Sequence, residues 1–79
     1  MTPAQCRAAR GLLNWTQKDL ARRSGVTINS IRTFEAGKTV PIRNNMAALV
    51  GALEQGGAIL VPEDNGVGPG VRLRKGAEA

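Results

Sequence analysis

The sequence contains no histidine, a single cysteine and almost no aromatic residues. With Cys6 as the only thiol and no histidine, we expect neither an intrachain disulfide nor a Cys/His zinc site, which suits a reducing cytoplasm. A long apolar run is also missing near the start, where Arg7 and Arg10 interrupt the chain, so we expect no signal peptide and no membrane span. Because only 3% of the residues are aromatic, any core must come mainly from Leu, Ile, Val and Ala.

Acidic residues are scarce relative to basic ones. The 79 residues include 11 Lys and Arg against six Asp and Glu, a formal net charge of +5. Such a surface attracts polyanions, and nucleic acid is the first candidate. A chain of this length has room for one small core, which favours a binding module. We expect no enzyme activity and no cofactor, because paired carboxylates, a nucleophile–base set and a phosphate-binding glycine loop are all missing.

Capping signals and apolar periodicity predict helices over residues 3–13, 16–24, 27–36 and 44–55. Thr2, Thr16 and Thr27 are suitable N-caps, since a threonine hydroxyl can accept from a free amide of the first turn. Glycines follow the predicted helix ends, as C-terminal caps require. The residues expected to face the core are Cys6, Ala9, Leu13, Leu20, Ala21, Val26, Ile31, Phe34, Met46, Leu49, Val50 and Leu53.

The composition changes after Gly57. An apolar run at 58–61, a loop rich in Gly, Asn, Asp and Pro, and an alternating segment at 71–74 predict two short strands, while residues 75–79 are expected to fray. The fold class predicted is therefore an all-α domain of four to five helices with a short C-terminal β-hairpin. Residues 1–57 form the helical unit, and residues 58–79 form a hairpin and basic tail whose open edge is a candidate dimerisation element.

The segment from Gln17 to Glu35 contains the main functional signal. A short helix, a glycine-containing turn and a second short helix follow one another without slack. A small residue at Ala21 lets the two helices approach, and apolar residues at Val26 and Ile31 lock the second helix across the first. This pattern is typical of a helix-turn-helix, and the alternative is an ordinary helical hairpin in an all-α domain.

The stretch TQKDLARRSGVTINSIRTFEAGK, residues 16–38, resembles the Cro and phage-repressor (XRE-type) helix-turn-helix regulators. With its flanking helices the resemblance covers roughly residues 3–55, and it implies a lambda-repressor-like DNA-binding domain. It also implies that Arg10 pairs with Glu35. The place of Arg10 on an otherwise apolar helix face independently favours a carboxylate partner, against the alternative of two solvated charges.

Helix 27–36 is expected to enter the major groove, which admits one α-helix, and to read base edges from its N-terminal part. The predicted base-reading residues are Thr27, Ile28, Asn29, Arg32 and Thr33. Asn29 suits adenine, Arg32 suits guanine, and Ile28 suits a thymine methyl group. The predicted phosphate contacts are Gln17, Ser30, Lys38 and Arg43.

These features predict a sequence-specific transcriptional regulator, a repressor that binds double-stranded DNA as a homodimer through its C-terminal strands. Ile28 stands where the family often has a polar residue, so the alternative is a protein-binding antiactivator or antitoxin-like module that uses the same helical face. Cys6 and Trp15 are predicted to fill and cover the core. For Arg72, Arg74 and Lys75 two interpretations remain open, a second phosphate contact or the solvated face of a strand.

Overall fold

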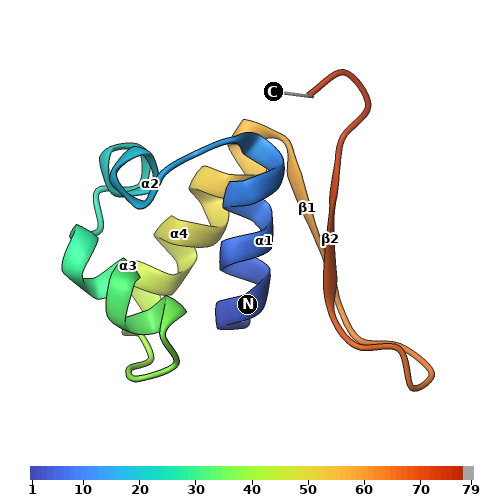
Figure 1. Ribbon diagram of the computed structural model, residues 1–79, viewed down its shortest axis with the longest axis horizontal. Helices are drawn as coiled ribbons and strands as arrows, with labels where there is room; N and C mark the ends of the chain where they lie inside the picture. The colour runs from blue at the N-terminus through green and yellow to red at the C-terminus, as the bar shows by residue number, and fades with distance from the viewer. Residues whose placement is uncertain (78–79) are drawn as a thin grey trace.

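The computed structural model describes residues 1–77 as four helices followed by a β-hairpin (Figure 1). The elements are α1 (Pro3–Leu13), α2 (Gln17–Ser24), α3 (Ile28–Glu35), α4 (Arg43–Gly56), β1 (Ala58–Val61) and β2 (Gly70–Leu73). The four predicted helices and the hairpin are present, and no fifth helix occurs within these 77 residues. The label all-α is therefore too narrow, because a two-stranded antiparallel sheet is part of the fold.

Each of the first three helices begins at a threonine whose hydroxyl accepts from an amide three residues later. The O···N distances are 3.0 Å from Thr2 to Gln5, 3.0 Å from Thr16 to Asp19 and 3.3 Å from Thr27 to Ser30. The side chains of Gln5 and Asp19 accept in return from the cap amides, which completes two capping boxes. Local sequence alone therefore sets where these helices start.

The core lies among the four helices and is closed by the first residue of the hairpin. Its buried apolar side chains are Cys6, Ala9, Leu13, Leu20, Val26, Ile31, Phe34, Leu49, Ala52, Leu53 and Ala58. On α4 the buried face is made by residues 49, 52 and 53, the i, i+3, i+4 spacing of one helical stripe. Val50 was expected in the core but is only half-buried, because it lies to one side of that stripe.

Trp15 covers the end of the core next to α4. Its ring is half-buried and lies so close to Gly56 that a Cβ there would come within 2.6 Å of the indole. The guanidinium of Arg23 stacks on the indole ring of Trp15, 4.3 Å from the ring centroid. The prediction that Trp15 covers the core is confirmed, since it packs against the buried cluster.

The hairpin is continuous with the core and does not form a separate arm. β1 and β2 pair antiparallel with Ala58 opposite Leu73, and Val71 and Leu73 pack against the core. At the tip Asp64 and Val67 exchange N–H···O bonds of 2.9 and 2.8 Å around a two-residue turn. Both turn residues have positive φ, +47° at Asn65 and +80° at Gly66, as a type I′ turn requires.

Gln5 fastens the hairpin to α1. Its side-chain nitrogen donates to the carbonyl oxygens of Val61, at 3.2 Å, and Gly70, at 3.1 Å, one on each strand. After β2, the Ala77 amide donates to the Arg74 carbonyl at 3.0 Å. Residues 75–77 are thus held in a turn, whereas the expected fraying of 78 and 79 lies outside the described residues.

The elements are arranged so that α3 and the hairpin lie on opposite sides of α1 and α4 (Figure 1). Molecular extents are 31 × 29 × 19 Å. Because the hairpin lies on the far side of α1 and α4, it leaves the outer face of α3 uncovered.

No helix within residues 1–77 has the length and hydropathy that a membrane crossing requires.

Candidate nucleic-acid interface

A three-residue turn joins α2 to α3 and sets the angle between them. Gly25 closes α2 with a φ of +78° and donates its amide to the Ala21 carbonyl at 2.9 Å. The amide of Val26 then donates to the Ser24 hydroxyl at 3.1 Å, and the Val26 side chain is buried. Because Thr27 immediately caps α3, the turn has no slack and α3 is held in one orientation.

The two faces of α3 have different environments. Ile31, Phe34 and Glu35 are buried, whereas Ile28, Asn29 and Arg32 are exposed. The buried residues lie at a spacing of three and four, and Asn29 and Arg32 point away from them. Ile28, three residues before Ile31, lies at the border of the buried face and is 37% exposed. In the described part of the chain no hydrogen bond or ion pair engages the side chains of Asn29 and Arg32, which leaves their donors and acceptors free for a ligand.

The hydroxyl groups of Thr27, at the N-cap of α3, and Thr33, within α3, differ from these exposed side chains, because each already has hydrogen-bond partners inside the protein. Thr27 Oγ1 donates to Ser30 Oγ at 3.0 Å besides capping the helix. Thr33 Oγ1 lies 3.1 Å from the Asn29 carbonyl, 3.3 Å from the Ser30 carbonyl and 2.8 Å from Thr39 Oγ1. The five predicted base-reading residues thus divide into three with free side chains and two with engaged hydroxyls.

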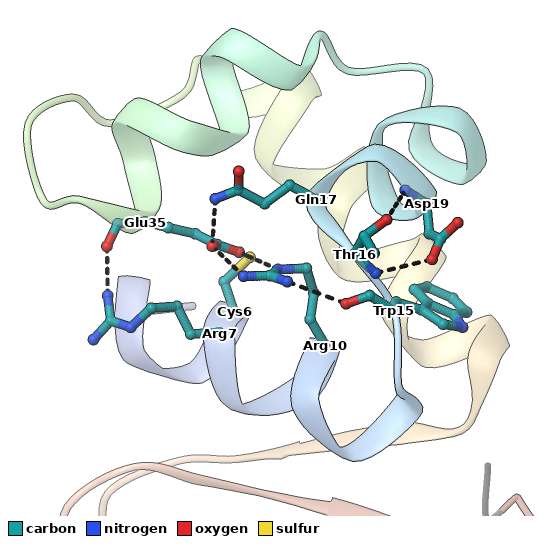
Figure 2. A network of polar contacts seen from close by, with 8 residues as sticks. All are labelled: Cys6, Arg7, Arg10, Trp15, Thr16, Gln17, Asp19 and Glu35. Carbon is teal, nitrogen blue, oxygen red and sulfur yellow. Dashed lines mark hydrogen bonds and ion pairs between the residues drawn. The ribbon is translucent and has the colours of Figure 1, made fainter.

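Glu35, the last residue of α3, anchors the C-terminal end of this helix. Its carboxylate accepts hydrogen bonds from side chains of two other helices (Figure 2). Arg10 of α1 binds it in bidentate fashion, with Nε 2.7 Å from Oε2 and Nη2 2.6 Å from Oε1. Cys6 of α1 donates to Oε2 at 3.1 Å, and Gln17 of α2 donates to Oε1 at 3.0 Å. One side chain, 4% exposed, therefore ties α1 and α2 to α3.

These contacts move the pKa values of both acidic groups. Burial alone would raise the pKa of Glu35, but hydrogen bonds from Arg10, Gln17 and Cys6 and the charge of Arg10 hold it below its ordinary value. Burial, together with the hydrogen bond and charge of Glu35, raises the pKa of the Cys6 thiol to about 12. At neutral pH the site consequently holds an ionised carboxylate beside a neutral thiol.

Arginines of α1 also bind main-chain carbonyls near this anchor. Arg7 donates to the Glu35 carbonyl oxygen at the end of α3, and Arg10 Nη1 donates to the Trp15 carbonyl at 3.1 Å (Figure 2). Sequence reasoning identified Arg10 but not the roles of Arg7 and Gln17. The phosphate contact expected of Gln17 stays a prediction, and one N–H of its side-chain amide donates to Glu35.

The surface around α3 is electropositive because its carboxylates are already paired. Asp19 binds Arg22 at 3.1 Å, and Glu35 is buried with Arg10. Five cationic side chains around α2, α3 and the start of α4 form no ion pair with any residue from 1 to 77, and these are Lys18, Arg23, Arg32, Lys38 and Arg43. Arg23 stacks on Trp15 instead. Such a surface suits the phosphate backbone that flanks a DNA groove.

The basic residues at the other end of the chain do not belong to this surface. Arg72, Arg74 and Lys75 are exposed and lie on or directly after β2, across the molecule from α3 (Figure 1). A DNA duplex seated on α3 would therefore leave these three residues outside its footprint.

Comparison with known proteins identifies the same segment. A family model described as helix-turn-helix matches residues 7–55, which span α2, α3, most of α1 and nearly all of α4. No curated protein matches the chain. The matched segment covers more than half of the 79 residues and stops before the hairpin. The chain therefore belongs to the helix-turn-helix family of DNA-binding regulators, of the XRE or Cro/cI type.

Proposed function

We propose that this protein is a sequence-specific transcriptional repressor that acts in the cytoplasm by inserting α3 into the major groove of DNA. The observation that supports this proposal most directly is the contrast between the two faces of α3. Its inner face is fixed by a buried core and the Glu35 anchor, and its outer face presents free side chains at Ile28, Asn29 and Arg32. Repression then needs only occupancy, because a bound protein excludes others from the same DNA.

The proposed division of labour follows from the chemistry of these groups. Asn29 can bind adenine through two hydrogen bonds, Arg32 can bind guanine likewise, and Ile28 can pack on a thymine methyl group. Lys38 and Arg43, both exposed, are the proposed phosphate ligands. Gln17 and Ser30 are also proposed phosphate ligands. Gln17 offers the main-chain amide at the start of α2 besides its side chain, which donates to Glu35. Ser30 Oγ accepts from Thr27, so its own hydroxyl hydrogen can be donated to a phosphate.

Selection of bound fragments from random duplex DNA tests the proposal. The wild-type chain should enrich a common motif, and Asn29→Ala should alter the preference at one or two positions of it. Arg43→Ala should weaken binding to every duplex alike and reduce the slope of log K against log salt by about one. A chain that enriches no motif, or that binds DNA without salt dependence, would contradict the proposal.

A second candidate function is favoured by exposed apolar side chains beside α3. Ile28 is 37% exposed, and Val40 and Ile42 in the following loop are 81% and 68% exposed. Apolar groups this open are typical of protein-binding surfaces, as in an antiactivator or antitoxin-like module. In that case Ile28→Ala would abolish binding to a partner protein, and duplex DNA would compete poorly with it.

We further propose that the protein acts as a homodimer joined through the hairpin. Ile59 is 44% exposed on the face of β1 that turns away from the core, directly opposite Arg72 of β2. Carboxylates at the tip, Glu63 and Asp64, and cations near the base, such as Arg74, give the hairpin opposite charges at its two ends. Antiparallel association of two hairpins about a two-fold axis would bring these unlike charges together and leave both α3 helices free.

A further inference from the structure

Thr33 occupies a place on α3 from which base contact was predicted, yet its hydroxyl is directed toward its own protein. The carbonyl oxygens of Asn29 and Ser30 lie 3.1 and 3.3 Å from Thr33 Oγ1, and both can only accept. When the hydroxyl proton of Thr33 goes to these carbonyls, Thr39 Oγ1, 2.8 Å away, donates to Thr33. With either hydroxyl as the donor, Thr33 Oγ1 is bound within the protein and joined to Thr39.

Thr33 also holds the loop through its main chain. α3 ends in a Schellman motif, in which Lys38 donates its amide to the Thr33 carbonyl at 2.9 Å and Gly37 donates to the Phe34 carbonyl at 2.9 Å. Gly37 has the left-handed φ of +77° that this motif needs. Thr33 is thus joined to two consecutive loop residues, to Lys38 through its carbonyl oxygen and to Thr39 through its hydroxyl.

Lys38 lies between these two attachments and its side chain is exposed. A lysine on an untethered loop would lose conformational freedom on binding a phosphate, and this loss weakens binding. Because residues 38 and 39 are both fixed to α3, the loop loses this conformational freedom during folding and not on binding DNA. The loop is then ordered before DNA arrives.

We propose that Thr33 and Thr39 form a hydroxyl latch that positions Lys38 for phosphate contact, and that Thr33 does not read a base. This inference rests on the proposed DNA-binding function and specifies it further. Base reading then falls to Ile28, Asn29 and Arg32. The latch contributes affinity that is common to all DNA sequences.

Threonine-to-valine substitutions test the latch, because valine keeps the shape and removes the hydroxyl. Thr33→Val should weaken binding to every duplex by about three- to tenfold and leave the selected motif unchanged. Thr39→Val should have the same effect, and the double variant should be no weaker than either single one. In the Thr33→Val background, Lys38→Ala should cost less than about twofold further, although it weakens the wild-type chain more.

A measurement without DNA completes the test. Amide hydrogen exchange at Lys38, Thr39 and Val40 should be faster in Thr33→Val than in the wild type, while exchange within α1 stays the same. A changed base preference in Thr33→Val, additive losses with Lys38→Ala, or unaltered exchange would each overturn the latch. Failure of the wild-type chain to bind any duplex would instead overturn the proposed function, and the exchange data would still show whether the loop is tethered.

Discussion

Glu35 is the residue on which the position of α3 depends most. Its carboxylate oxygens accept from Arg10, Cys6 and Gln17, so every side-chain donor to Glu35 comes from a helix other than its own. Removing one partner of such a buried pair leaves an uncompensated charge, which is more costly than never having built the pair. Two predictions follow from the chemistry of this site.

The first concerns stability as a function of pH. The pKa of Glu35 is lower in the folded protein than its ordinary value of 4.5, so the unfolded chain binds the proton more tightly. The stabilisation is therefore present above that ordinary value and is lost as the pH falls through the folded-state pKa. Glu35→Gln should lower the free energy of unfolding at pH 7 by roughly 3 kcal/mol and should approach the wild type in acid.

Urea unfolding at pH 7 and at pH 3 measures this difference. Glu54→Gln is the matched control, because Glu54 is exposed on α4 and has no ion-pair partner within residues 1–77. If wild type and Glu35→Gln lost equal stability between the two pH values, the carboxylate would not be the group that responds to acid.

The second residue-level prediction concerns Cys6. A thiol that is fully buried and has its pKa raised to about 12 contains almost no thiolate at pH 8. Iodoacetamide should therefore alkylate the folded protein at least about a hundredfold more slowly than the urea-unfolded chain at the same pH. Mass spectrometry over time follows the modified fraction. Comparable rates in the two states would show that Cys6 is a reactive thiol and not a core residue.

Sequence reasoning at this scale succeeded where one helix face was enough. Arg10 was identified as needing a carboxylate because it interrupts an apolar stripe within a single helix. Gln5 and Gln17 could not be identified in this way, since neither places a charge within an apolar stripe; the partners of Gln5 lie 56 and 65 residues away and the partner of Gln17 lies 18 residues away. An amide side chain gives no periodic signal, so its partners become visible only when the helices are packed.

Helix boundaries, by contrast, follow from contacts between residues three apart. Thr2, Thr16 and Thr27 each cap the helix that follows, and this is why α1, α2 and α3 begin where the sequence predicts. The hairpin also had a local signal, the pair Asn65-Gly66, which favours a type I′ turn. Only a loop was predicted there, so the register that this turn imposes on the two strands was missed.

The attachment of the hairpin to α1 leads to a prediction at the level of elements. Gln5→Leu removes the donor to the Val61 and Gly70 carbonyls and the acceptor for the Thr2 amide. It should lower the free energy of unfolding by about 2 kcal/mol, since each lost hydrogen bond costs about 1 kcal/mol and some groups regain water.

The control is Gln55→Leu, at an exposed position near the end of α4. Urea titrations of the two variants should differ, with Gln55→Leu close to the wild type. Equal stability of both variants would mean that the hairpin is held by its apolar side chains alone.

For the molecule as a whole, the opposite placement of α3 and the hairpin separates two functions. One end presents the proposed reading helix, and the other presents a sheet with Ile59 exposed (Figure 1). Truncation after Gly57 would remove Ala58, Val71 and Leu73 from the core, so it cannot distinguish loss of association from loss of folding. A substitution on the outer face of the hairpin avoids this difficulty.

Ile59→Lys should convert the proposed dimer into a monomer in light scattering, because it places a second cation beside Arg72 at the centre of the contact. Helix content should not change, since Ile59 faces away from the core. Val40→Lys, in the exposed loop before α4 and outside the hairpin, should remain dimeric. A wild-type chain that is already monomeric, or an Ile59→Lys variant with the wild-type mass, would rule out association through this face.

The separation of the two faces of α3 has a consequence for evolution. Asn29 and Arg32 share a helix with the residues that hold the domain together but are themselves exposed, and Ile28 lies at the border of the packed face. Mutations at these three positions can therefore accumulate at less risk to folding than mutations of Ile31, Phe34 or Glu35. Descendants of such a chain could acquire new target sites while inheriting the same scaffold, and an engineer could exchange the trio in the same way.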